Sequence, residues 1–423
     1  MTGPGSARLD LAEVVRLEGA RILATLVRTT GSLQIAEDAV QEAAVRALRD
    51  WPRSGVPDQP RAWLTVTARR VAIDMLRRES VRAGKERDSM DLTPGDPPPD
   101  RVVRDDRLRL LFTCCHPALA LDAQVTLALR VLCGLSPAQV AAVLLATEAA
   151  VAKRLTRTRT KIARARIPYR LPAAEELPGR VAAVCAVLHA SYTIAHTAVG
   201  GPRMSDVDGC REAVRLARLV HELMPDEPGP MAVLALMLLT ESRRAARLDP
   251  AGDPVPLADQ DRDRWDRAMI AEGTGLLDRS LRRTDAVADP YQLQAAVAAE
   301  HARAPSYRDT DWAEVVRLYD ILVAVAPTAA AGLARAVAVA EARGAAAGLR
   351  ALADVEPDQR WHAVRGELLA REGRFREAVT ATEVSLDRTV SEPERRHRRS
   401  RIAEWASVDP VVAVRPPAAG PPG

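Results

Sequence analysis

The sequence has no apolar run long enough to cross a membrane. Its longest such run, residues 231–239, is far shorter than the ~20 residues that a transmembrane helix needs. The first residues also lack the basic and then apolar pattern of a secretory signal. These two absences predict a cytoplasmic protein that makes no membrane contact.

Cysteine pairs and catalytic motifs are also missing. The five cysteines contain no C-x-x-C pair, and a cytosolic chain of this length is not expected to use them as a disulfide framework; they are Cys114, Cys115, Cys133, Cys185 and Cys210. We expect most of them to be buried as small hydrophobic residues. A metal site at Cys114-Cys115-His116 is an alternative, but adjacent helical residues point about 100° apart and no second ligand pair has zinc-site spacing.

Neither a nucleotide-binding loop nor a general acid–base pair accompanies this cysteine cluster. We therefore expect no enzyme, no catalytic residue, no metal and no cofactor. The alternative is an enzyme or metal protein centred on the cluster. Elemental analysis that found stoichiometric metal would support that alternative.

Charge is unevenly distributed along the 423 residues. Residues 1–170 carry 28 basic and 19 acidic side chains, whereas residues 171–423 carry 32 and 37. The front part is therefore +9 and the rear part −5. Such a split favours nucleic-acid binding by the front part, and the length predicts two or three domains.

Residues 134–166 have the pattern of a helix-turn-helix. Gly134 can end one helix, and Ser136-Pro137-Ala138-Gln139 fits a capping box with proline in the first turn. Thr147 is a suitable N-cap for a second helix. That helix has an apolar stripe on one side and a basic face on another. The stripe is Val151, Leu155, Thr158 and Ile162, and the basic face is Arg154, Arg157, Lys161 and Arg164. The alternative is a basic face that is simply solvated.

Two further helical stretches precede this motif, on either side of a proline-rich loop at residues 51–60. The first has an apolar stripe of Ala36, Ala39, Val40, Ala43, Ala47 and Leu48, which leaves Glu37, Asp38, Gln41 and Glu42 on the remaining surface. The second buries Leu64, Ala68, Val71, Ala72 and Met75 and presents Arg69, Arg70, Arg77 and Arg78. The second helix therefore offers another basic face.

The rest of the chain divides at proline-rich segments. Residues 81–106 have the composition of a flexible acidic linker, residues 179–410 are helical, and residues 411–423 resemble a disordered tail. Within the helical region, Gly366, Leu369, Gly373, Phe375 and Ala378 have tetratricopeptide (TPR) spacing, and similar offsets occur near Ala213 and Val315. We expect a degenerate α-solenoid, with an irregular helical bundle as the alternative.

The residues EDAVQEAAVRALRDWP at 37–52 and AWLTVTARRVAIDMLRRE at 62–79, followed by a linker and a helix-turn-helix, resemble the extracytoplasmic-function (ECF) sigma factors of the sigma-70 family. LFTCCHPAL at 111–119 and the long helical region resemble a subgroup with a C-terminal TPR-like extension. The resemblance implies an all-α fold with two small sigma domains, region 2 at residues 8–80 and region 4 at 107–167, followed by the solenoid.

The resemblance implies that the protein binds core RNA polymerase, through the β′ clamp helices and the β subunit, and recognises promoter DNA. Asp38, Gln41 and Glu42 would contact polymerase. Around the −10 element, DNA would be bound by Trp51, Trp63, Arg69, Arg70 and Arg77, because a flipped base needs a stacking surface and a cationic rim. Core packing is an alternative role for both tryptophans.

The second helix of the helix-turn-helix would read the −35 element. The residues expected there are Thr147, Glu148, Val151 and Lys153 at base edges or adjacent phosphates, and Arg154 and Arg157 on the backbone. The acidic linker would imitate transcript in the RNA exit channel or serve only as a soluble connection. The extension would regulate activity, in either direction, or bind a protein partner.

Two departures from the family pattern are visible. Ala68-Arg69-Arg70 stands where the family often has Ala-Arg-Asn, and residues 188–201 differ from the YLIFNEGY-like motif of the subgroup. The alternative function is a helix-turn-helix regulator that binds operator DNA without polymerase and senses a ligand through the solenoid. It leaves the acidic face beside a basic helix unexplained.

Overall fold

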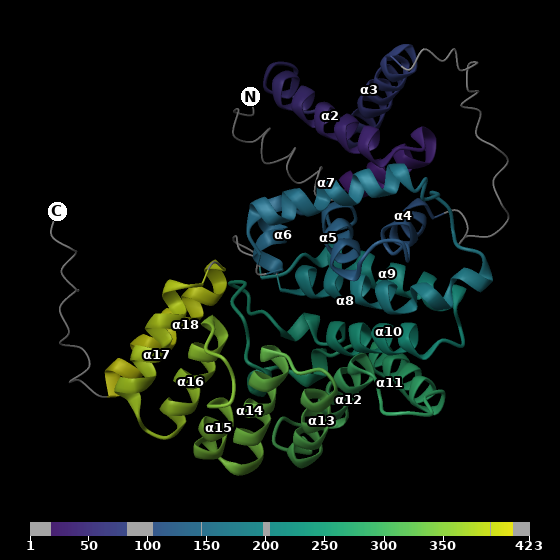
Figure 1. The fold of residues 1–423 in the computed structure, drawn as a ribbon. Helices are drawn as coiled ribbons and strands as arrows, with labels where there is room; N and C mark the ends of the chain where they lie inside the picture. The colour runs from purple at the N-terminus through teal and green to yellow at the C-terminus, as the bar shows by residue number, and fades with distance from the viewer. Residues whose placement is uncertain (1–17, 83–104, 145, 198–203, 390, 409–423) are drawn as a thin grey trace. The chain divides into compact units, whose positions relative to one another are not determined.

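The computed structural model describes residues 18–82, 105–144, 146–197, 204–389 and 391–408. Over these residues every regular element is a helix, apart from one isolated bridge between Leu248 and Pro254. The expected all-α fold is confirmed (Figure 1). The expected linker lies almost entirely outside the described residues, and the expected C-terminal tail lies wholly outside them.

The chain forms two compact units. Unit 1 comprises Met1–Ala195 and Val207–Pro225, and unit 2 comprises His196–Asp206 and Asp226–Gly423. The sequence placed the start of the extension at residue 179. In the structure, residues of this expected extension belong to the unit that contains the helix-turn-helix.

Unit 1 begins with a helix at residues 18–30 and a pair of long helices. These are α2 (Leu33–Ser54) and α3 (Pro60–Arg82), which pack against each other. Ser32 caps α2 by accepting a hydrogen bond from the Ile35 amide. The loop predicted at residues 51–60 is shorter than expected, because α2 continues through Pro52 to Ser54. There the Gly55 amide donates to the Trp51 carbonyl, and a φ of +82° at Gly55 ends the helix.

The next four helices contain the helix-turn-helix. They are α4 (Asp106–Cys114), α5 (Leu121–Val131), α6 (Pro137–Val143) and α7 (Glu148–Arg164). The predicted capping box is present: Ser136 Oγ accepts from the Gln139 amide, and Gln139 Oε1 accepts from the Ser136 amide. Thr147 caps α7, and Gly134 adopts a φ of +69° after α5. Local sequence signals therefore place both helices of the motif correctly.

Two helices of the extension complete unit 1. They are α8 (Val181–His196, of which His196 falls in unit 2) and α9 (Val207–Leu223). Two short 3-10 turns, Ala174–Glu176 and Pro178–Arg180, lead into α8. Among the described residues one helical stretch, Ala174–His196, is long and apolar enough to span a bilayer by composition. A buried core helix of a soluble protein meets the same criterion.

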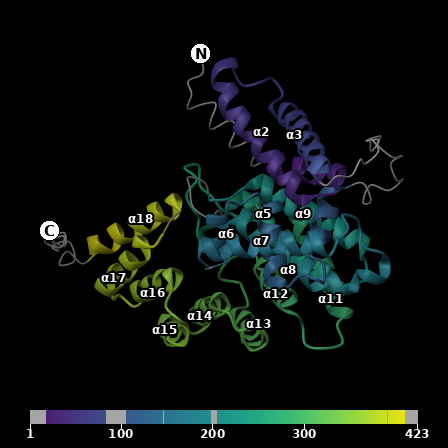
Figure 2. The ribbon, with the colours of Figure 1, turned by 45° about the horizontal axis from the view of Figure 1, so that its top comes forward.

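Unit 2 is a TPR-like solenoid. Its helices are α10 (Pro228–Glu241), α11 (Arg267–Arg282), α12 (Pro290–Arg303), α13 (Trp312–Val325), α14 (Ala329–Arg343), α15 (Ala345–Leu352), α16 (Gln359–Arg371), α17 (Phe375–Asp387) and α18 (Glu392–Val408). Each helix packs mainly against its neighbours in the chain, which is the contact pattern of a repeat protein. Figure 2 shows α13 to α18 following one another in order.

Close helix crossing in the solenoid depends on small residues. At Gly366, a Cβ atom would stand 2.2 Å from Thr382 Oγ1 and 3.2 Å from the Ala378 carbonyl oxygen. Gly373 has a φ of +72° and forms the turn between α16 and α17. Glycine is therefore required at both positions, at Gly366 because the helices cross closely and at Gly373 because the turn needs a positive φ.

Candidate nucleic-acid interface

The acidic face of α2 is partly exposed. Gln41 is exposed, whereas Asp38 and Glu42 are half-buried; Asp38 accepts hydrogen bonds from Gln34 Nε2 and Glu42 pairs with Arg46 at 3.0 Å. The structure differs from the sequence prediction at Glu37, which is only 6% exposed. Leu48, predicted to be in the apolar stripe, is 45% exposed.

The two tryptophans near the end of α2 pack together. Their ring centroids are 5.7 Å apart and the ring planes meet at 68°, which is an edge-to-face arrangement. Trp51 is 2% exposed and so presents no ring face to a base in this structure, because its side chain fills the core between α2 and α3. Trp63 is half-buried and keeps part of its surface accessible.

The basic face of α3 is exposed. Arg69, Arg70 and Arg77 all lie on the solvent side of the helix, while Leu64, Ala68, Val71 and Ala72 are buried. Of the predicted buried stripe, only Met75 is half-buried. These three arginines give the exposed side of α3 a positive charge, which is the kind of surface that attracts a phosphate backbone.

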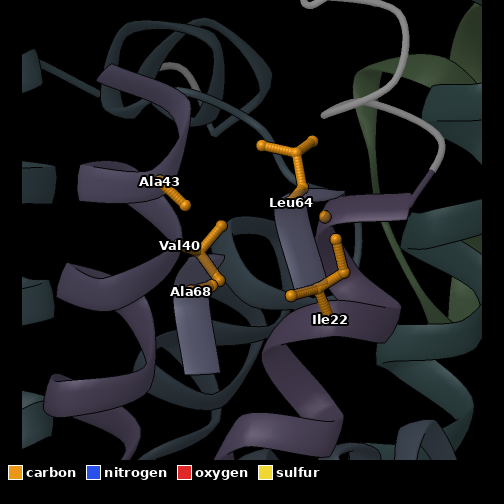
Figure 3. Close-up of a pocket in the computed structure, with 6 residues that line it drawn as sticks. Ile22, Val40, Ala43, Leu64 and Ala68 are labelled. Atoms are coloured by element: carbon orange, nitrogen blue, oxygen red, sulfur yellow. The ribbon is translucent and has the colours of Figure 1, made fainter. Parts of the chain in front are cut away.

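A small pocket lies between residues 18–30, α2 and α3. Figure 3 shows Ile22, Val40, Ala43, Leu64 and Ala68 around it, and Gly19 completes the lining. All six residues lack a polar side-chain atom, so this pocket offers no chemistry for a reaction or a metal ion. We interpret it as a gap where three helices pack.

The second helix of the helix-turn-helix, α7, carries exposed and buried residues on opposite faces. Thr147, Glu148, Lys153 and Arg157 are exposed, as predicted for residues that reach DNA. Val151 is fully buried, so its predicted contact with a base edge does not fit this structure. It belongs to the stripe of Val151, Leu155 and Thr158 that packs the helix-turn-helix.

Arg154 is held inside the helix-turn-helix. Its Nε atom lies 3.2 Å from Asp122 and its Nη1 atom donates to Thr126 Oγ1 at 3.1 Å, both of which belong to α5. The side chain that the sequence placed on the DNA backbone therefore links α7 to α5. Figure 1 shows these two helices side by side.

A charge cluster connects α2 with α7. Arg159 donates from Nε and Nη2 to the two carboxylate oxygens of Glu37, each at 2.8 Å, and Arg130 Nε lies 3.8 Å from the same carboxylate. Sequence reasoning missed Arg159. Arg159 directly follows Thr158, the last buried residue of the apolar stripe. Its position at the edge of the packed face was the sequence feature that could have predicted a contact with another helix.

The extension contributes polar contacts to the helix-turn-helix domain. Arg180, which is 5% exposed, donates to the Phe112 carbonyl at 3.0 Å, and Glu212 of α9 pairs with Arg107 at 3.2 Å. Arg215 of α9 contacts Asp105, the N-cap of α4. Burial raises the pKa of Asp105, but the hydrogen bonds from Arg215 and the Leu108 amide lower the pKa overall.

The cysteine cluster lies in an apolar environment. Cys114 and Cys115 are fully buried, and burial raises the pKa of both thiols above the usual range because a thiolate is poorly solvated there. His116 Nδ1 accepts a hydrogen bond from the Ala118 amide. None of the five cysteines, all of which lie among the described residues, forms a disulfide, and Cys114 and Cys115 serve as core residues.

Comparison with known proteins adds to this geometry. Residues 14–82 match the family model "Sigma-70 region 2". The "Probable ECF RNA polymerase sigma factor SigI" of Mycobacterium tuberculosis is 33% identical over 147 residues, which cover 33% of this chain and 50% of that protein. The chain belongs to the ECF sigma-70 family.

This ECF sigma-family protein also has a relative along nearly its whole length. An uncharacterized protein of Rhizobium meliloti is 39% identical over 405 residues, covering 92% of this chain and 95% of the relative. Residues 180–281 match a family of unknown function, DUF6596, which begins at the extension. The crystal structure of yeast Tom70 aligns with 97% of this chain and 88% of that one, at 11% identity and a TM-score of 0.36, too distant to bear on function.

Proposed function

We propose that this ECF sigma-family protein binds core RNA polymerase and directs it to a two-part promoter. The observation that carries this proposal is the partly exposed polar face of α2 together with the exposed arginines of α3, in the same unit as a helix-turn-helix with exposed basic residues. The protein would catalyse no reaction itself and would act in the cytoplasm of a bacterium. Polymerase supplies the catalysis.

In this proposal each surface has its own partner. The face of Asp38, Gln41 and Glu42 binds the β′ clamp helices, α3 contacts the melted −10 strand, and α7 enters the major groove of the −35 element. Region 4 also contacts the β subunit. Trp63, half-buried in the first turn of α3, is the tryptophan better placed to touch a base, since Trp51 fills the core.

The extension regulates the factor in this proposal. Its helices α8 and α9 belong to the same compact unit as the helix-turn-helix, which favours intramolecular control, and unit 2 offers a solenoid surface to a protein partner. The test is transcription by core polymerase with this protein on genome-wide promoter fragments. Failure on every fragment would sink the proposal, and tight duplex binding without polymerase would favour an operator-binding regulator.

Charge reversal on α2 tests the polymerase face. We expect an Asp38→Lys and Glu42→Lys double variant to bind core polymerase about tenfold more weakly, because complementary charge is lost at the contact. Asp50→Lys is the matched control, since Asp50 is exposed on the same helix two turns beyond Glu42. Binding would be measured by fluorescence anisotropy. Equal weakening by the control would contradict a specific acidic face.

Two arginines of α7 should behave differently. Arg157→Ala is expected to weaken binding to −35 duplex DNA and to reduce the salt dependence of binding by about one phosphate contact, because Arg157 is exposed. Arg154→Ala should instead lower the melting temperature and leave the salt slope unchanged, because Arg154 contacts Asp122 and Thr126. Salt titrations and thermal unfolding would measure both effects. A normal slope for Arg157→Ala would remove this residue from the interface.

A further inference from the structure

Glu37 is a buried acid on a helix whose neighbouring acids are accessible. The residue lies next to Asp38 on α2, and its carboxylate is enclosed by Arg159 from α7 and Arg130 from α5. The pairing with Arg159 is bidentate, with both hydrogen bonds at 2.8 Å. Such fork-to-fork geometry is the strongest form of an arginine–carboxylate contact.

The pair joins two surfaces that the proposed function assigns to different partners. Glu37 extends the acidic face that would meet polymerase, and Arg159 lies two residues after Arg157 on the helix that would meet DNA. While the two side chains pair with each other, neither is available to a partner. The contact therefore removes one negative charge from the first surface and one positive charge from the second.

Arg130 makes a longer contact with the same carboxylate, at 3.8 Å, and two further contacts across the junction are more exposed or uncharged. Arg28 pairs with Asp106 at 3.1 Å, but the arginine side chain is 44% exposed, and exposed pairs of this kind contribute little. The Tyr169 hydroxyl also hydrogen-bonds the Ala24 carbonyl at 2.9 Å. Glu37 and Arg159, at 6% and 23% side-chain exposure, form the better shielded charged contact between regions 2 and 4.

We propose that Glu37 and Arg159 form a latch that holds regions 2 and 4 together in the free protein. When polymerase and promoter separate the regions, Glu37 joins the polymerase-facing acids and Arg159 binds a DNA phosphate. The two residues are thus additional binding residues whose charges are masked until the protein opens. The latch itself rests on the observed contact, and the roles after opening rest on the proposed function.

The latch is tested by a distance measurement on the full-length protein. Arg49 and Ala149, both exposed, would be replaced by cysteine and labelled with a fluorescent donor and acceptor, since Cys114, Cys115, Cys185 and Cys210 are buried and Cys133 is half-buried. Glu37→Gln and Arg159→Gln should each shift the distribution to longer distances. The double variant should open no further than Glu37→Gln alone, because that change already removes the contact with Arg159.

Arg28→Gln is the matched control, because it also removes a cation from the junction. It should leave the distance distribution unchanged. Circular dichroism would verify that each variant keeps its helix content, so that unfolding is not mistaken for opening. Unchanged distances in folded Glu37→Gln and Arg159→Gln proteins would overturn the latch, and so would equal opening by Arg28→Gln.

Binding to −35 duplex DNA without polymerase separates the latch from the function. Glu37→Gln should bind about tenfold more tightly and raise the salt slope by about one, because it frees Arg159 for a phosphate. The Arg159→Gln protein should also open, but the salt dependence of its DNA binding should not increase, because it lacks the arginine that would bind the phosphate. If Glu37→Gln lengthens the distance and leaves DNA binding unchanged, the latch stands and the proposed role of α7 on DNA fails.

Discussion

A protein that ends at Pro172 is expected to lose the folded helix-turn-helix domain, whereas one that ends at Pro225 keeps it. The shorter cut removes Arg180, Glu212 and Arg215 together. Breaking a buried ion pair by removing one partner costs about 3–5 kcal/mol, and Arg107, paired with Glu212, has a side chain only 13% exposed. The Phe112 carbonyl would also lose its buried donor, at about 1–3 kcal/mol.

Hydrogen exchange along α4 and thermal unfolding would measure this effect. We expect amides of α4 to exchange rapidly in the protein that ends at Pro172 and slowly in the protein that ends at Pro225. Arg180→Met in the full chain isolates one contact and should lower stability by about 1–3 kcal/mol. Equal protection of α4 after both cuts would show that α8 and α9 are not part of this domain.

This result also decides how regulation by the extension can be measured. A cut at Pro172, which follows the domain boundary expected from the sequence, changes folding and regulation at once. A cut at Pro225 removes most of unit 2 and keeps the contacts of α9 with α4. Transcription by the longer protein therefore shows whether the solenoid inhibits or activates.

Acidification from pH 7 to pH 5 is expected to destabilise unit 2 by about 2 kcal/mol for each of two histidines. Burial lowers the pKa of His301 to about 4 and that of His196 to about 3, and nearby arginines, including Arg243, lower both pKa values further. The unfolded chain, with a usual histidine pKa near 6.5, takes up protons first as the pH falls. Stability is therefore fully present above pH 6.5 and is lost as the pH falls toward 4.

Thermal unfolding at several pH values would test this dependence. His301→Gln should reduce the stability lost between pH 7 and pH 5 by about 2 kcal/mol, because it removes a group whose pKa is lowered on folding. An identical pH dependence in the His301→Gln variant would contradict a neutral buried His301.

Local sequence signals predicted most of the helices. The caps at Ser136 and Thr147 and the stripe of Val151, Leu155 and Thr158 involve residues within one or two turns of each other, so their spacing alone carries the information. The same holds for Gly366 and Gly373 in the solenoid. The motif pattern was also sufficient to identify the ECF sigma family.

Whether an individual side chain of the candidate interface is exposed, buried or paired depended on residues far away in the chain. Glu37 was expected on the exposed surface and Val151 at the DNA, and helical periodicity does not reveal that Glu37 is covered by an arginine 122 positions later. Trp51 and Arg154 differ from the prediction for the same reason. Trp51 is buried in the core between α2 and α3, and Arg154 contacts Asp122 and Thr126 of α5.

The sequence by itself determined the helical class, the helix-turn-helix and the family, because caps, periodicity and motif spacing are local properties. Only the tertiary structure decided which charges remain exposed and where the unit with the helix-turn-helix ends. Whether Arg159 meets water, phosphate or Glu37 depends on how α7 packs against α2. Whether α9 belongs to region 4 depends on the contacts of Glu212 and Arg215 with residues more than 100 positions earlier.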